Sequence, residues 1–169
     1  QMSETDAIEP LHIDGDCRIA GLSEVDRNRL TRVSGKLDAR DSTGLTLPAL
    51  ESCGTLDARY SANLTLPALE KCGTLDARDS TALTLPALKS CGTLDARESA
   101  NLTLPSLASV EGDLDASNTT NLTLPSLTSV GGNLSARDST GLTLPLLEHV
   151  GGKLDAGNTT DLTLPLLTS

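Results

Sequence analysis

The stretch GTLDARDSTALTLPALKSC, residues 73–91, is one copy of a motif that fills most of this 169-residue chain. Its glycine recurs at intervals of 19 and then 20 residues, at Gly35, Gly54, Gly73, Gly92, Gly112, Gly132 and Gly152. A Leu-Thr-Leu-Pro segment follows each of these glycines at a constant distance, first as residues 45–48 and last as 162–165. A period near 20 residues is typical of a solenoid, in which each coil stacks on the next.

Alternating apolar and polar residues predict where the strands lie within a coil. Leu37 and Ala39 point to one side of the chain and their neighbours to the other, as successive side chains of a strand do. Leu45 and Leu47 bracket an outward Thr46 in the same way. Two short strands per coil are therefore expected.

Turn-forming residues separate these strands. Residues 41–44 are Asp, Ser, Thr and Gly, and Pro48 lacks the N–H that a strand interior needs, so both are expected at turns together with Gly54. Leu50 and Cys53 add a third inward-facing side. We therefore expect three short parallel sheets around a leucine core, and strand twist favours a right-handed winding.

The predicted fold is all-β, a right-handed parallel β-helix (solenoid) of seven 19–20-residue coils over residues 35–169. Residues 15–34 form a degenerate N-terminal capping coil, and residues 1–14 are an N-terminal tail. The capping coil keeps the apolar spacing of the others. The aligned pairs are Cys17 with Leu37, Ile19 with Ala39, Val25 with Leu45, Leu30 with Leu50 and Val33 with Cys53.

Polar substitutions in this coil suit an outermost position that faces water. Arg27 stands where the other coils have a leucine, and Asn28 replaces the proline. A short helix starting at Ser23 is an alternative, because Ser23-x-x-Asp26 resembles a capping box. Either arrangement caps the solenoid.

The other end has no such device. The chain stops at Ser169, in the middle of a coil, and an open strand edge is an aggregation hazard. We expect either a truncated solenoid with further sequence after Ser169 or an end-to-end homodimer through this uncapped coil. Burying each of its leucines would contribute about 1.5–3 kcal/mol, and a two-fold contact closes without propagating.

The segment LPSLTSVGGNL, residues 124–134, resembles the repeat unit of leucine-rich-repeat-like β-solenoid proteins of bacteria and their phages, and more distantly the receptor L domain. The resemblance covers residues 35–169 and implies a coiled β architecture. It carries over no catalytic residue, because these families share none. The first coils depart from the pattern with Cys-Gly in place of Val-Gly-Gly, and the disulfide-rich flanks of receptor ectodomains are missing from this sequence, so receptor-type extracellular ligand binding is not implied.

The net charge of −10 disfavours direct binding to nucleic acids and to anionic membranes. No stretch approaches the roughly 18 apolar residues that a spanning helix needs, and the N-terminus lacks the pattern of a signal peptide. We therefore expect a cytoplasmic protein, or a component of a phage particle.

Two columns of repeated residues offer candidate metal sites. Cys53, Cys72 and Cys91 share a column with Val110, Val130 and Val150, which favours a buried, reduced thiol over a disulfide or zinc site. An acidic column lies beside a basic one, and we expect ion pairing between them rather than calcium binding, because the Gly-Gly-x-Gly-x-Asp calcium repeat is missing. The acidic column is Asp38, Asp57, Asp76, Asp95, Asp115 and Asp155, interrupted by Ser135, and the basic one is Arg40, Arg59, Arg78, Arg97 and Arg137.

A threonine column is the most regular outward feature. It comprises Thr46, Thr65, Thr84, Thr103, Thr123, Thr143 and Thr163. Regular threonine columns on a flat face bind ice in some solenoids, but the position two residues earlier holds Gly, Asn, Ala or Asp, so only one column is expected here. Threonine is also simply a good exposed strand residue.

Tyr60 is the one plausible anchor for a protein partner, since its column otherwise holds Asp, Asn and Glu and interface hot spots favour tyrosine. With only two histidines and no phosphate-binding glycine loop, the sequence favours a non-catalytic repeat scaffold or protein-interaction module without a cofactor or metal. The alternatives are an ice-binding solenoid and an acidic DNA mimic that inhibits a nucleic-acid enzyme.

Overall fold

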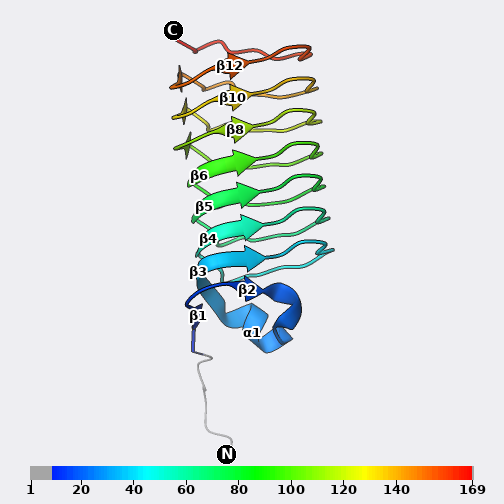
Figure 1. Cartoon of the computed structure of the whole chain (residues 1–169), viewed down its shortest axis with the longest axis vertical. Helices are drawn as coiled ribbons and strands as arrows, with labels where there is room; N and C mark the ends of the chain where they lie inside the picture. Colours follow the sequence, from blue (N-terminus) through cyan, green and yellow to red (C-terminus); the bar gives the residue numbers. More distant parts are fainter. Residues whose placement is uncertain (1–8, 169) are drawn as a thin grey trace, which may run out of the picture.

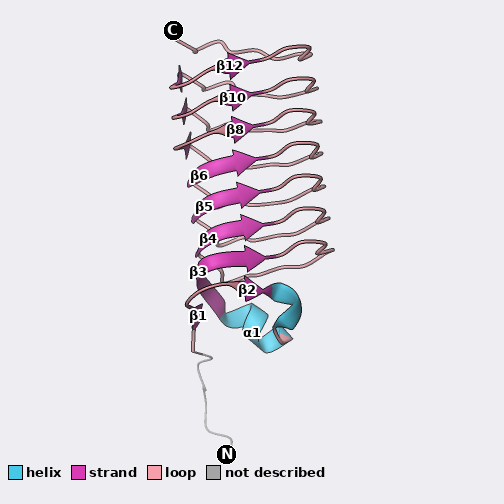
Figure 2. Cartoon of the chain, viewed as in Figure 1, coloured by secondary structure: helices cyan, strands magenta, loops and turns pink. Residues whose placement is uncertain are grey.

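Each coil contributes leucines at the same inward positions, and the stacking of these positions builds the core. In the computed structural model, which describes residues 9–168, seven coils stack along one axis into a parallel β-solenoid (Figure 1). The leucines of five consecutive coils at the Leu64 position are fully buried. The prediction of an all-β solenoid is confirmed, and among residues 9–168 helix occurs only in the N-terminal cap (Figure 2).

The first four coils each contain one continuous strand, and the last three contain two shorter ones. The continuous strands are β3 (Leu30–Asp38), β4 (Ser52–Asp57), β5 (Lys71–Asp76) and β6 (Ser90–Asp95). The shorter ones are β7 (Ser109–Val110) with β8 (Leu114–Asp115), β9 (Ser129–Val130) with β10 (Leu134–Ser135), and β11 (His149–Val150) with β12 (Leu154–Asp155). All pair in parallel, with a register shift between Val33 and Lys36 where β3 pairs with β4, and equivalent residues of successive coils are partners, so the columns of the sequence are columns in space.

The repeated glycine lies inside a strand, and the prediction that Gly54 marks a turn was wrong. It lies in the middle of β4. A Cβ at the equivalent Gly73 would lie 2.5 Å from the carbonyl oxygen of Gly54, which is far inside van der Waals contact. Glycine is therefore required for the close approach of neighbouring coils and not for a turn.

The extra residue of the 20-residue coils falls beside this glycine. Three residues separate Val110 from Leu114, where two separate Cys91 from Leu94, although both pairs keep the same register. In these coils the insertion lies between two short strands, whereas β3 holds the same extra residue, between Val33 and Leu37, as a register shift within one continuous strand.

The three predicted sheets are replaced by one sheet and two series of single bridges. The predicted strand at Leu45–Leu47 forms only an isolated parallel bridge, from Thr46 to Thr65, and Thr43 before it forms another, to Ala62. The left-handed backbone of Gly44, with φ of 62°, and the turn at Pro48 leave too little extended chain between them for a longer ladder.

The cap combines strand pairing with a helix. It contains β1 (Leu11–Ile13), β2 (Cys17–Arg18), the 3-10 helix η1 (Ile19–Gly21) and α1 (Glu24–Arg29). The predicted alignments of Cys17 with Leu37 and of Val33 with Cys53 are confirmed, and β1 adds a strand beside β3 in a stretch predicted to be a tail.

Of the two predicted caps, the helix is present. Ser23 caps α1, its hydroxyl accepting a hydrogen bond from the Asp26 N–H at 3.1 Å. Val25, predicted to face the core, lies on this helix and is 58% exposed. The coil alternative was therefore wrong between Glu24 and Arg29.

Candidate functional site

Tyr60 occupies a turn position that suits it poorly. Its φ is 57°, in the left-handed region, and the residue is 59% exposed. Asn and Asp tolerate this conformation because their short side chains bond locally, whereas bulkier residues adopt it at a cost. The same position in the other coils holds Asp41, Asp79, Glu98, Asn118, Asp138 and Asn158, all with positive φ. As the single aromatic residue of the chain, Tyr60 is exposed as predicted.

The predicted threonine column forms a straight series along the solenoid. Parallel bridges join Thr46, Thr65, Thr84, Thr103, Thr123 and Thr143 in order, and Thr163 is exposed in the last coil. These residues are exposed or half-buried. We call this series the Thr46 column.

A second series of bridged residues, which the sequence analysis missed, lies three residues earlier in each coil. Its members are Thr43, Ala62, Thr81, Ala100, Thr120, Thr140 and Thr160. Simple alternation predicts that Gly44, two residues before Thr46, also faces outward. Gly44 and its equivalents adopt the left-handed conformation instead, and the outward position moves to the residue before them. The positive φ is signalled by the Gly, Asn or Asp that fills most of these positions. We call this series the Thr43 column.

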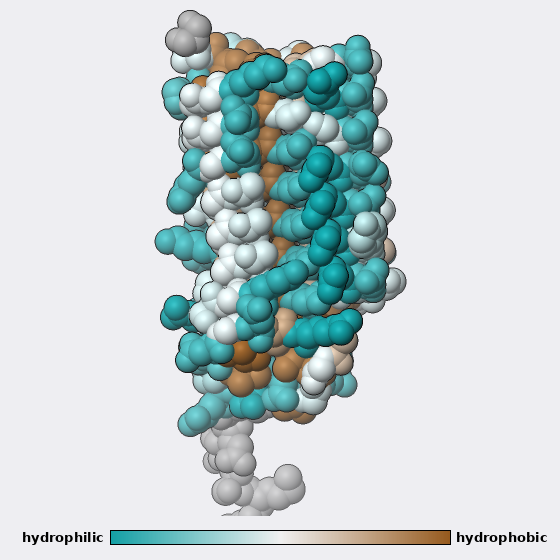
Figure 3. Space-filling model, in the orientation of Figure 1, coloured by the Kyte–Doolittle hydropathy of each residue, from teal (hydrophilic) through white to brown (hydrophobic). Residues whose placement is uncertain are grey.

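The acidic and basic columns form one continuous network along the first four coils, which we call the Asp–Arg ladder. Arg59 Nε and Nη2 each donate to the Asp57 carboxylate at 2.8 Å, and Arg59 Nε also lies 3.4 Å from Asp76 Oδ2 of the next coil. Arg78 repeats this pattern with Asp76 and Asp95. Figure 3 shows the hydrophilic side chains running in rows along the face of the strands. The predicted ion pairing is confirmed.

Asp57 is the most enclosed carboxylate of the ladder, with its side chain 2% exposed. Burial alone would raise the pKa of Asp57, but hydrogen bonds from Arg59 and Lys36 outweigh it and hold that pKa well below its usual range. The Lys36 ammonium lies 2.7 Å from the carboxylate. Farther along, Ser117 replaces the arginine, and its hydroxyl donates to Asp115 at 2.6 Å.

The cysteine column lies in the core as free thiols. Cys53, Cys72 and Cys91 are buried and unbonded, and burial raises the pKa of Cys53 and of Cys91 to about 12. Within residues 9–168, no group of three or more His, Cys, Asp or Glu side chains is arranged to hold a metal ion.

A buried serine column was not anticipated from the sequence. Ser61, Ser80 and Ser99 are at most 2% exposed, and each hydroxyl donates to the carbonyl of the alanine three residues earlier, at 2.5–2.7 Å. No buried side-chain nitrogen or oxygen of the described residues lacks a partner. In the described part of the chain, the buried polar side chains of the interior therefore find their partners within the protein.

No known protein-family model, curated protein or solved structure matches the chain. In the part of the chain that the structure describes, none of the helices has the length and apolar character needed to cross a membrane.

Proposed function

We propose that the chain is a non-catalytic repeat scaffold that presents its outer surface to a protein partner. The observation that carries this proposal is Tyr60, an exposed aromatic side chain held in a left-handed turn where other coils place Asp, Asn or Glu. Strained backbone conformations at exposed residues are concentrated at functional sites. Tyrosine is also enriched among the residues that contribute most to the binding energy of protein–protein interfaces.

Capture of a partner from an extract of the source organism tests the proposal. The bait is the purified chain, compared with Tyr60→Asn and Glu98→Asn. Both variants should fold, because Asn118 and Asn158 already occupy the same turn position. We expect one protein to bind the wild type and Glu98→Asn but not Tyr60→Asn. Equal capture by all three would overturn the role of Tyr60.

Ice binding is the second candidate, and the Thr43 column favours it. Together with the Thr46 column it gives two outward series with the spacing of the coils, about 4.8 Å. Thr84→Tyr should abolish thermal hysteresis, whereas Thr128→Tyr, at an exposed position outside both columns, should leave it unchanged. A wild-type chain without thermal hysteresis would eliminate this candidate.

The Asp–Arg ladder argues against the DNA-mimic alternative. Carboxylates bound by arginines, such as Asp57, Asp76 and Asp95, are poor substitutes for free phosphates. We therefore expect no competition with duplex DNA in assays of DNA-processing enzymes.

A second copy of the chain is another candidate partner. Leu166 is 44% exposed in the last coil, and Leu162 is only partly buried although its equivalents in the five preceding coils are fully buried. We expect end-to-end homodimers of the 169-residue chain, visible by light scattering at two concentrations. The resemblance of the repeat unit to solenoids of bacteria and their phages supports a place in a phage particle, and the cytoplasmic location stays a prediction from the sequence.

A further inference from the structure

The first coil, residues 35–53, has an edge that no other coil covers. Within the solenoid, each coil bonds to both neighbours. Thr65 N–H donates back to the Leu45 carbonyl at 2.9 Å, and Leu47 N–H donates forward to the Thr65 carbonyl at 3.1 Å. The equivalent groups of the first coil, the N–H and carbonyl groups of Thr43 and Thr46, make no backbone hydrogen bond to any residue from 9 to 168. We call these four groups the open edge.

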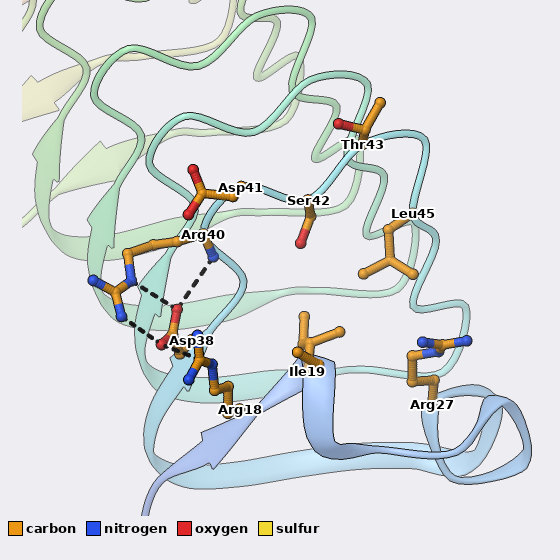
Figure 4. A pocket seen from close by; sticks show the side chains of 10 residues that line it. Arg18, Ile19, Arg27, Asp38, Arg40, Asp41, Ser42, Thr43 and Leu45 are labelled. Carbon is orange, nitrogen blue, oxygen red and sulfur yellow. Dashed lines mark hydrogen bonds and ion pairs between the residues drawn. The ribbon is translucent and has the colours of Figure 1, made fainter.

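The edge is open because the cap leaves the path of the solenoid. After β2 the chain turns into η1 and α1 instead of running beneath residues 40–46. A hollow of about 380 Å³ remains between the cap and the first coil (Figure 4). Leu45 borders it and is only partly buried, while Leu64 and Leu83 of the same column are fully buried.

The hollow carries unusual charge for so acidic a chain. Arg18, Arg27 and Arg40 line it, against Asp38 and Asp41. Arg40 is bound to Asp38 through two hydrogen bonds, but Arg18 reaches the same carboxylate only at 3.9 Å, with its side chain 74% exposed. Arg27 makes no ion pair with another described residue. The surroundings of the open edge therefore favour a ligand with a carboxylate.

We propose that the open edge binds an extended peptide segment of a partner protein by strand addition. The segment supplies the backbone that a missing coil would supply, places an aliphatic side chain under Leu45, and directs a carboxylate at Arg18 or Arg27. This names a binding site and partner chemistry for the proposed interaction module, and it rests on that proposed function.

A complete second solenoid does not fit this edge. The cap projects beyond the first coil along the stacking axis (Figure 1), so another set of coils would collide with α1 before reaching Thr43 and Thr46. Only a single extended segment enters the hollow from the side. The occupant is therefore a peptide stretch and not a stacked copy.

A labelled peptide with the sequence of residues 155–165, DAGNTTDLTLP, is a suitable probe for fluorescence anisotropy. Its Leu-Thr-Leu-Pro sequence repeats that of residues 45–48, where Leu47 N–H donates to the next coil, and it has two carboxylates and no basic side chain. In the position of a missing coil, its Leu164 N–H points to the Thr46 carbonyl, while its Thr163 N–H points away. We expect saturable binding that N-methylation of Leu164 weakens at least tenfold and that N-methylation of Thr163 leaves unchanged.

The protein side has a matched pair of variants. Arg27→Glu should weaken binding of the probe at least fivefold. Lys89→Glu makes the same charge change at an exposed position outside the hollow and should have no effect. The two N-methylated peptides also show whether the probe binds at the cap or at the last coil of the solenoid. Binding at the last coil would be abolished by N-methylation of Thr163 and not by N-methylation of Leu164.

Absence of saturable binding, equal effects of the two N-methyl groups, or binding at the last coil would each overturn the inference. These outcomes are distinct from failure of the proposed scaffold function. A partner captured through Tyr60, together with no peptide binding, would remove the open-edge site and leave the scaffold function standing. Peptide binding without a Tyr60-dependent partner would remove the role of Tyr60 alone.

Discussion

Replacing Asp57 with Asn tests whether the Asp–Arg ladder stabilises the fold. The carboxylate is almost fully enclosed and is contacted by Lys36 at 2.7 Å and by Arg59 at 2.8 Å. Removing one member of a buried ion pair costs about 3–5 kcal/mol. The cations here are 25–41% exposed and regain some hydration, so we expect a loss of about 2–3 kcal/mol in the free energy of unfolding.

Asp115→Asn is the matched control, because Asp115 belongs to the same column but its side chain is 37% exposed. Its loss should stay within about 1 kcal/mol, as for surface pairs. Urea unfolding followed by circular dichroism near neutral pH measures both variants. Equal losses at the two positions would refute the argument that burial sets the strength of the ladder.

Acid provides an independent check on Asp57. Its folded-state pKa lies below the unfolded value of about 3.9, so its contribution is fully present above the unfolded value and is lost as the pH falls toward the folded value. The difference in stability between wild type and Asp57→Asn should therefore shrink below about pH 4. A difference that stays constant as the pH falls would contradict this linkage.

Three further perturbations test other features. Gly73→Ala should lower the free energy of unfolding, measured by urea titration, by more than about 2 kcal/mol or prevent folding, because the added Cβ would lie 2.5 Å from a backbone oxygen. Gly21→Ala should be nearly neutral in the same assay, because no atom lies within 4 Å of its added Cβ. Ala82→Asn should raise the free energy of unfolding by about 0.5–1 kcal/mol in the same assay, because Asn tolerates the φ of 55° and its amide can bond to those of Asn63 and Asn101. A lower free energy of unfolding would contradict this explanation. Cys53 and Cys91 should resist a thiol reagent in the native protein near pH 8 and react at once in denaturant, since burial raises both pKa values to about 12; fast native labelling would show that the column is open.

The repeat register was predictable because the same apolar motif recurs every 19 or 20 residues along the chain. The alignment of Cys17 with Leu37 and of Val33 with Cys53 needed only the spacing of apolar residues. The helix at Ser23 was foreseen as an alternative from its capping pattern. The sequence left open whether strand pairing or helix formation prevails in residues 24–29, because the apolar spacing favours a coil that buries Val25, while the capping pattern favours the helix, which leaves Val25 exposed.

The wrong or missing predictions concern residues whose conformation cannot be inferred from the alternation of apolar and polar residues. Gly54 lies within a strand because a neighbouring coil leaves no room for a Cβ, a contact invisible before the coils are stacked. The Thr43 column was missed because the left-handed residue between it and Thr46 breaks the period of two. The open edge is a property of the cap's path, which no single residue specifies.

The strict register between coils has an evolutionary consequence. Because Cys53, Cys72 and Cys91 lie directly over one another, removing or duplicating one 19-residue unit among the first coils returns every following side chain to the column it already occupies. Recombination between such similar stretches of a gene can therefore lengthen or shorten the rod by one rung while both ends and all outer surfaces keep their pattern. Length becomes a heritable trait that varies independently of the cap and of whatever the columns bind.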